Sequence, residues 1–275
     1  MRITNPSNFK KMAGGRAPMT ALDNGHVIKR VGAQESRFNF FKPHFLRGKT
    51  ACVCIIRDER GTRLTREACE VCKADFRAGK YHGITGCFLV MQDITHGMEN
   101  VRVLDVKIGT RQHGDYVALK KQKKQISKYM RSTSYKYGLR MGGLFSIDSI
   151  KRNGGNAFGY KQLVDKITHF FGKNKKLYEQ AILRLKKMIA TLKTLDTLRL
   201  FGASLLIAIN EAEVPVKDKI VIVLVDFAKA THADILANKI IHNGVDAGAI
   251  LGLQNMIDIL EKNKSWADQP YTAPF

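Results

Sequence analysis

The sequence predicts an α+β protein in which strands come first and long helices follow. Apolar runs bounded by turn residues predict strands over 26–29, 50–57, 86–91 and the segment around Asp105, all before residue 110. Beyond that point, apolar residues recur at helical spacing over 115–131, 161–171, 175–195 and 247–260. The chain has 275 residues, 44% of them hydrophobic, which is enough for one large domain or two small lobes around a real core.

Shorter elements complete this order. The turn Asp23-Asn24-Gly25 predicts a hairpin leading into the strand at 26–29, and residues 33–41 predict a short helix that contains Glu35. Within the helical part, the runs 204–209 and 220–225 predict paired buried strands, the second of which ends on Asp226. Residues 1–13 are expected to form a loose arm.

The net charge of +22 limits the classes of function. A protein this basic either binds a polyanion or has a basic surface for solubility or localisation. No apolar run reaches the roughly 18 residues of a membrane helix, and the N-terminus lacks the apolar part of a signal peptide. We therefore expect an intracellular protein, cytoplasmic or nuclear. No helix-turn-helix, RNP or zinc-finger pattern is present, so we expect no nucleic-acid partner, and we expect a monomer.

The cysteines leave one metal question open. Their odd number in a long chain argues against a disulfide framework. Cys69 and Cys72 have zinc-knuckle spacing, and Cys52 with Cys54 could complete a four-sulfur site. However, Cys-x-Cys on a strand is an unusual half-site, so reduced structural thiols are the favoured interpretation for these residues and for Cys87.

The run around Asp105 and Lys107 is the clearest candidate for chemistry. Strand alternation puts these two side chains on one face, whereas Val106 and Ile108 point to the other. A carboxylate beside an ammonium group is costly in a core, yet it can hold a hydroxyl and neutralise a phosphate together. An exposed edge strand with a chance ion pair is the alternative.

Three further patterns carry weaker indications. Asp226 emerges from a buried strand, where a carboxylate can hold magnesium over phosphates or cap a helix, and Ser204 opens the neighbouring strand. Lys29 with Glu35 is similar to the lysine–glutamate pair of kinases, a pattern that is frequent by chance. The helix at 115–131 carries a basic stripe that is either a solvated face or a polyanion site, formed by Lys121, Lys124, Lys128 and Arg131. Its apolar residues Leu119, Ile126, Tyr129 and Met130 are expected to face a core.

Several motifs in one order resemble a known family. Asp105-Val106-Lys107-Ile108-Gly109 resembles the PxxxDxKxG signature of the inositol polyphosphate kinases, and residues 110–114 (TRQHG) with Ser132-Thr133-Ser134 are similar to the inositol hexakisphosphate kinase branch. Further matches are Gly14-Gly15, residues 203–206 (ASLL), residues 225–228 (VDFA) and the closing pattern from Asp246 to Leu253. The chain departs from the family pattern at Val101, Ala203 and Lys229.

The resemblance implies a two-lobed protein-kinase-like fold that binds ATP and Mg2+ between the lobes. The antiparallel-sheet N-lobe would span 1–95, and the larger mixed, helix-rich C-lobe would span 96–275 with inositol phosphate-binding helices in 115–171. By this resemblance, Lys29, oriented by Glu35, would hold the ATP phosphates, and Gln92 and Asp93 would contact adenine and ribose. Asp105 would contact the ribose or the reacting group, and Lys107 would bridge the substrate and the γ-phosphate. Magnesium would be bound by Ser204 and Asp226, and the substrate phosphates by Arg111, Lys121, Lys124 and Lys128.

The activity implied is an ATP-dependent inositol phosphate kinase that converts inositol hexakisphosphate to a diphosphoinositol polyphosphate. Two alternatives stay open: a multikinase acting on hydroxyls of lower inositol phosphates, and a non-catalytic inositol phosphate receptor. Retention of Asp105, Lys107 and Asp226 argues against the receptor.

Overall fold

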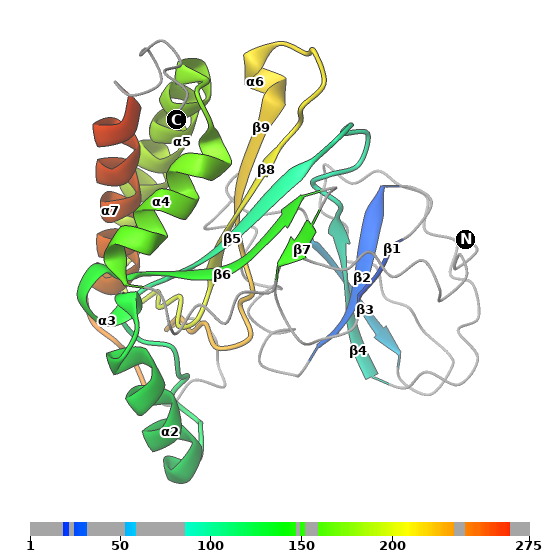
Figure 1. The fold of residues 1–275 in the computed structure, drawn as a ribbon. Coiled ribbons are helices and arrows are strands. Elements are labelled where there is room, and N and C mark those ends of the chain that lie inside the picture. Colours follow the sequence, from blue (N-terminus) through cyan, green and yellow to red (C-terminus); the bar gives the residue numbers. More distant parts are fainter. Residues whose placement is uncertain are drawn as a thin grey trace.

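Two antiparallel sheets and a layer of helices form the described part of the chain (Figure 1). The computed structural model describes residues 19–21, 25–31, 53–58, 86–146, 149–151, 159–233 and 240–264. Glu35, Gly14-Gly15, the predicted helix at 33–41, the N-terminal arm and Cys52, Cys69 and Cys72 lie outside these residues.

The first sheet has four strands in the order β1-β2-β4-β3. Its members are β1 (Met19–Ala21), β2 (His26–Val31), β3 (Val53–Asp58) and β4 (Gly86–Gln92). Neighbouring strands are antiparallel, and Lys29 of β2 lies opposite Leu89 of β4. The predicted strands at 26–29 and 86–91 are confirmed, and the strand predicted at 50–57 is confirmed from Val53 onward, because residues 50–52 lie outside the described residues.

The second sheet has five antiparallel strands in the order β7-β6-β5-β8-β9. These are β5 (Arg102–Ile108), β6 (Leu139–Ser146), β7 (Ser149–Lys151), β8 (Ser204–Ile209) and β9 (Ile220–Val225). The predicted pairing of the 204–209 and 220–225 strands is confirmed, with Ser204 opposite Val225. β6 and β7 were not predicted.

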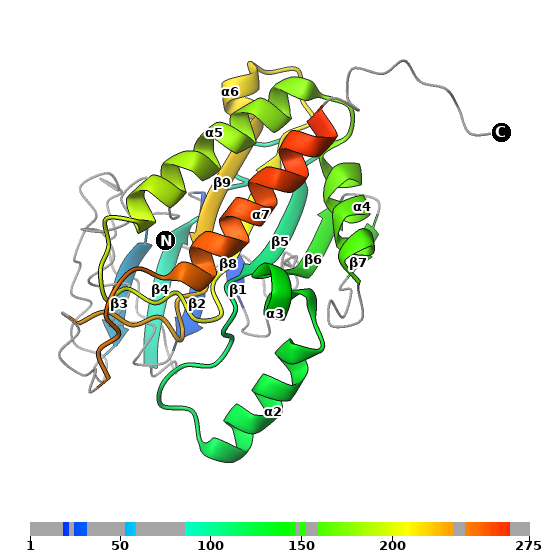
Figure 2. The same ribbon diagram turned by 90° about the vertical axis from the view of Figure 1, so that its left-hand side faces the viewer.

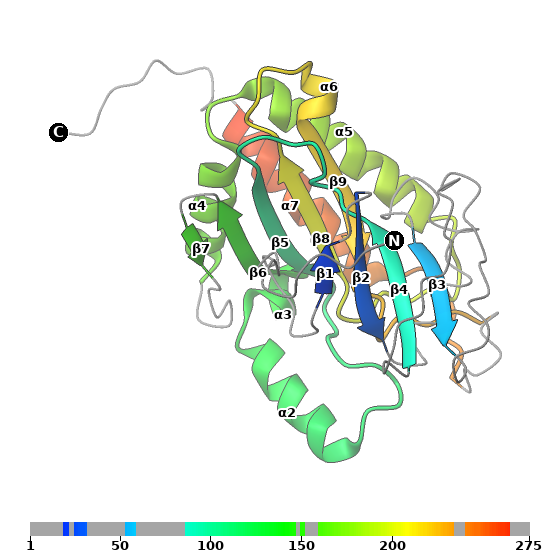
Figure 3. The same cartoon turned by 90° about the vertical axis from the view of Figure 1, so that its right-hand side faces the viewer.

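Helices cover one face of the five-stranded sheet, and the four-stranded sheet lies on its other side (Figures 2 and 3). The covering helices are α4 (Tyr160–Phe171), α5 (Lys175–Leu192) and α7 (Ala247–Lys264), which confirm three predicted helices. The short helix α3 (Thr133–Tyr137) precedes β6, and the short helix α6 (Val216–Lys219) joins β8 to β9.

Alternation along β5 divides the sheet into a core face and a polar face. Leu104, Val106 and Ile108 are fully buried in the main core with residues of α4, α5 and α7. Asp105 and Lys107 alternate with them and therefore lie on the opposite face, as the sequence pattern predicts. Every candidate site residue on this sheet thus projects away from the helix layer.

The N-terminal half of α7 packs closely against the ends of β5 and β6. A Cβ atom added to Gly252 would lie 2.3 Å from the carbonyl oxygen of Gly138, and one added to Gly248 would lie 2.6 Å from Thr110 Oγ1. Asp246 caps the helix by accepting a hydrogen bond from the Ala249 amide at 2.9 Å. The cap and the close packing together explain why the closing motif combines Asp246 with Gly248 and Gly252, two glycines one helical turn apart.

The helix predicted over 115–131 differs from the expectation. α2 spans Leu119–Met130 and buries none of its residues. Leu119 is 73% exposed and Met130 is 53% exposed, so the prediction that this helix contributes to a core is wrong. In all three views α2 lies away from α4, α5 and α7 (Figures 1–3).

Among the described residues, no helix has the length and apolar character needed to cross a membrane. The predicted lobe boundary at residues 95 and 96 falls in the turn between β4 and β5. That boundary stays a prediction.

Candidate functional site

Two lysines, one from each sheet, converge on the carboxylate of Asp226. Lys107 of β5 donates to Asp226 Oδ2 at 2.6 Å and to the carbonyl oxygen of Gly202 at 3.1 Å. Lys29 of β2 lies 3.9 Å from Asp226 Oδ1. The structure therefore brings together three predicted site residues that are far apart in the sequence.

The backbone and the charge of Asp226 both fit a functional residue. Its φ of 68° is in the left-handed region, which is uncommon for a residue with a side chain and concentrates at functional sites. Burial raises the pKa of this carboxyl, but the charges of Lys107, Lys29 and Lys229 outweigh burial and hold the pKa below its ordinary value. Asp226 is therefore a stable carboxylate at neutral pH.

Asp105 is in the opposite electrostatic situation. Burial raises its pKa above the ordinary value, although the charge of Lys107 and the hydroxyl of Ser204 act in the other direction. Its Oδ1 oxygen is buried and makes no hydrogen bond among the described residues, and the same holds for Ser204 Oγ. Gly142 gives this carboxylate its space, because an added Cβ atom would lie 2.5 Å from Asp105 Oδ1.

Lys229 is a further charged member of the site, and the sequence alone did not select it. Its ammonium group donates to the carbonyl oxygen of Gln112 at 2.6 Å. Burial lowers its pKa, the charge of Asp226 raises it, and the charges of Lys107 and Lys121 lower it. The signal available in the sequence was its position three residues after Asp226, where it departs from the family pattern.

Gln92 and Asp93, predicted to contact adenine and ribose, lie where β4 leaves the first sheet. The Asp93 amide donates to the carbonyl oxygen of Gly25 at 2.9 Å, and Asp93 Oδ1 accepts hydrogen bonds from the amide and the hydroxyl of Thr95. Gln92 is exposed. Gln92 is the last residue of β4, and Asp93 begins the turn that leads to β5. Contact of these two residues with adenine and ribose stays a prediction.

The lysines of α2 form a solvent-exposed basic face. Lys121, Lys124 and Lys128 are all exposed, and the helix contains no acidic residue. The charge of Lys121, in the first turn of α2, is among the charges that lower the pKa of Lys229.

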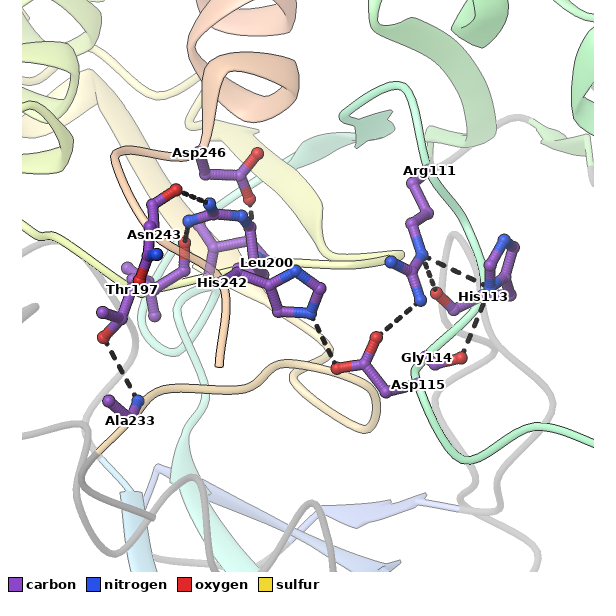
Figure 4. Close-up of polar contacts among 12 residues, drawn as sticks. Arg111, His113, Gly114, Asp115, Thr197, Leu200, Ala233, His242, Asn243 and Asp246 are labelled. Atoms are coloured by element: carbon purple, nitrogen blue, oxygen red, sulfur yellow. Dashed lines mark hydrogen bonds and ion pairs between the residues drawn. The ribbon is translucent and has the colours of Figure 1, made fainter. Parts of the chain in front are cut away.

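Arg111, predicted to contact substrate, is engaged within the protein. Its guanidinium group donates to Asp115 Oδ1 at 2.6 Å and to the carbonyl oxygen of His113 at 3.0 Å (Figure 4). The guanidinium carbon also lies 4.0 Å from the centre of the Phe201 ring. Substrate contact by this residue stays a prediction.

Metal binding has partial support from the geometry. Ser204 Oγ and Asp226 come from paired strands, and carboxylate and hydroxyl oxygens are ligands that Mg2+ accepts. Within the described parts of the chain, no cluster of three or more His, Cys, Asp or Glu side chains is arranged to hold a metal ion. Additional oxygen ligands would therefore have to come from water or from phosphates.

An α+β fold with a lysine–carboxylate site between two sheets defines a kinase-like protein, and the family is shown by comparison. The family model described as inositol polyphosphate kinase matches residues 88–261. The chain therefore belongs to the inositol polyphosphate kinase family.

Comparison with individual proteins gives more distant similarities. Inositol hexakisphosphate kinase 1 of Rattus norvegicus is 25% identical over 221 residues, covering 64% of this chain and 51% of the rat protein. Inositol hexakisphosphate kinase 2 of Oryctolagus cuniculus is 26% identical over 215 residues, covering 63% and 51% respectively. The chain thus spans about half the length of the curated relatives it matches.

A solved structure supports the fold. The inositol phosphate multikinase Ipk2 of S. cerevisiae, determined with ADP and Mn2+, superposes with a TM-score of 0.66 at 16% identity. The match covers 86% of this chain and 98% of that one. The predicted two-lobed kinase-like fold class is confirmed.

Proposed function

We propose that this protein is an ATP- and Mg2+-dependent inositol phosphate kinase whose main substrate is inositol hexakisphosphate. The observation that carries the proposal is the convergence of Lys29 and Lys107 on Asp226, from two different sheets. Membership of the family and the similarity to hexakisphosphate kinases support the reaction class and the substrate.

The residues present fit a nucleotide with its metal. Asp226 and Ser204 would supply oxygen ligands to Mg2+, and Lys29, 3.9 Å from Asp226 Oδ1, would hold nucleotide phosphates. Bound Mg2+ neutralises charge on the phosphate oxygens. Glu35, which would orient Lys29, lies outside the described residues.

The lysines of the site would neutralise charge on the transferred phosphoryl group and on the substrate. Lys107 is anchored by the carbonyl oxygen of Gly202 and can point its ammonium group at the transferred phosphoryl group. Because a phosphate acceptor is already ionised, transfer to it needs little base catalysis, and positioning with charge neutralisation carries the rate. The exposed lysines of α2, Lys121, Lys124 and Lys128, supply charge for the other phosphates of the substrate.

A multikinase that phosphorylates hydroxyls of lower inositol phosphates is the second candidate. The structural similarity to Ipk2 favours it. The raised pKa of Asp105 also favours it, because a hydroxyl acceptor must lose a proton and a carboxylate of raised pKa accepts protons more readily.

The test is ATP consumption with Mg2+ over a panel of inositol phosphates, with products separated by chromatography. A diphosphoinositol product from the hexakisphosphate is the expected result, whereas products from lower members only would support the multikinase.

Lys107→Ala and Asp226→Asn should each reduce kcat/KM by roughly 100-fold or more while thermal unfolding stays cooperative. Lys187→Ala, an exposed α5 residue, is the control and should retain activity. Near-normal turnover in both site variants would contradict the assigned roles.

A further inference from the structure

The position of α2 relative to the rest of the molecule depends mainly on its two ends. None of its residues is buried and only some are partly covered, so side-chain packing along the helix constrains its direction weakly. At its C-terminal end, Ser132, Thr133 and Ser134 are buried. Its N-terminal end continues from β5 through residues 109–118, and the contacts of that segment are therefore decisive.

The carboxylate of Asp115 is the anchor of this segment. Its side chain is only 3% exposed, and each of its two oxygens has a cationic or ring-nitrogen partner. Oδ1 accepts from Arg111 at 2.6 Å, and Oδ2 lies 2.9 Å from His242 Nε2 (Figure 4). His242 belongs to the loop that precedes α7, so Asp115 ties the approach to α2 to a distant segment of the chain.

Phe201 connects the same anchor to Lys107. The Arg111 guanidinium carbon lies 4.0 Å from the centre of the Phe201 ring, and the His242 ring meets that ring edge-on at 5.3 Å. Phe201 is followed directly by Gly202, whose carbonyl oxygen accepts a hydrogen bond from Lys107. One buried aromatic ring therefore contacts both partners of Asp115 and adjoins the backbone group that holds Lys107.

The loop that carries His242 is itself held in place. Arg199 donates to the carbonyl oxygens of Asn243 at 2.6 Å and Gly244 at 2.7 Å. Asp246 accepts from the Leu200 amide at 2.7 Å while also capping α7. These contacts hold the loop around His242, so the position of its ring nitrogen does not depend on Asp115.

We propose that Arg111, Asp115 and His242 are positioning residues that fix the direction of α2, and with it the lysines of that helix, relative to Lys107. The proposal has two parts. The first, that these residues fix the direction of α2, concerns the structure alone. The second, that they thereby affect substrate binding, rests on the proposed function, because it requires that the α2 lysines contact a phosphorylated substrate. Removing one partner of a buried carboxylate leaves a charge without compensation, so the segment must rearrange.

Hydrogen exchange tests the structural part without any activity. In His242→Ala and in Asp115→Asn, backbone amides of 119–130 should exchange roughly tenfold faster, whereas amides of α5 should be unchanged. His242→Gln, which keeps a nitrogen donor, should restore most of the protection. His169→Ala, an exposed histidine on α4, is the matched control. Unchanged exchange of α2 in both His242→Ala and Asp115→Asn would overturn the proposal.

Kinetics test the connection to the substrate. His242→Ala should raise KM for the inositol phosphate about tenfold, with KM for ATP within about twofold. In a cycle with Lys121→Ala/Lys124→Ala/Lys128→Ala, the two effects on KM should be far from additive, because His242 acts through those lysines. Additive effects, or equal rises in both KM values, would overturn this part. If the protein were inactive on every inositol phosphate, the proposed function would be refuted. Faster hydrogen exchange of α2 in the variants would still support the positioning role.

Discussion

At the scale of single residues, the two carboxylates of the site have opposite relations to stability. The pKa of Asp226 is held low by the lysines around it, so its ion pairs stabilise the folded state above the ordinary carboxyl pKa, and this stabilisation is lost as pH falls through the lowered pKa. The pKa of Asp105 is raised by burial, so its ionisation opposes folding as pH rises.

Replacement of Asp105 should separate stability from activity. Asp105→Asn removes a buried charge, so the midpoint of thermal unfolding at neutral pH should rise by roughly 2–4 °C for each kcal/mol of burial cost removed, while turnover falls. The gain should be absent at pH values below 3.8, the ordinary pKa, and should grow as pH rises toward the raised pKa of Asp105. Thermal scans between pH 3 and pH 8 measure it. A variant less stable than the parent at neutral pH would show that Asp105 is held by favourable pairing.

The residues of the site differ in how far sequence could predict them. Strand alternation alone correctly places Asp105 and Lys107 on one face, because that period is a local property of the backbone. No local property brings Lys29 to Asp226, since their approach depends on how two sheets pack. Lys229 was not selected because its neighbours in space, Gln112 and Gly114, are distant in the sequence.

At the scale of elements, α2 and β6 show where patterns mislead. The apolar stripe of α2 correctly indicates a helix, but a stripe does not say whether anything covers it, and here Leu119 and Met130 are exposed. β6 contains Gly142 and Gly143, and the register against β5 shifts between Asp105 and Val106. Such an irregularity interrupts the alternation on which strand prediction depends.

The close packing of α7 predicts a strong effect of one methyl group. Gly252→Ala places its Cβ against the Gly138 carbonyl, so the helix must shift, and the free energy of unfolding should fall by about 1–3 kcal/mol. Gly159→Ala is the control, because an added Cβ there meets no atom within 4 Å. Urea denaturation compares the two. Equal effects would mean that α7 accommodates the methyl group freely.

The basic face of α2 predicts a charge-dependent effect on substrate binding. The variant Lys121→Ala/Lys124→Ala/Lys128→Ala should raise KM for inositol hexakisphosphate by at least about tenfold and by less for a trisphosphate, because each lost cation interacts with fewer phosphates. The rise should shrink at high salt. The matched control is Lys176→Ala/Lys187→Ala/Lys193→Ala, which removes three exposed lysines in or next to α5. Identical KM changes for both substrates would contradict a phosphate-binding role for this face.

At the scale of the whole molecule, the fold class followed from the order of the elements and from family motifs spread along the chain. The motif from Asp105 to Gly109 ends β5, and the motif from Asp246 to Leu253 begins α7 against it, so the two recognisable patterns form one physical contact. The mixed character of the C-terminal part was underestimated, because β6 and β7 were not predicted. The net charge was compatible with a polyanion partner or with a basic surface for solubility or localisation, and it could not indicate where a polyanion would bind.

The ion pairs at Asp226 also affect the order in which nucleotide and metal ion bind. This carboxylate has two ammonium groups as counter-ions, so a lone divalent cation would have to compete with both. Phosphates that draw Lys29 and Lys107 away would free the same oxygens for the cation. We therefore expect calorimetry to show weak binding of Mn2+ alone and much tighter binding once ADP is present, with Lys107→Ala reducing that difference. Tight binding of Mn2+ alone would mean that metal and nucleotide enter independently.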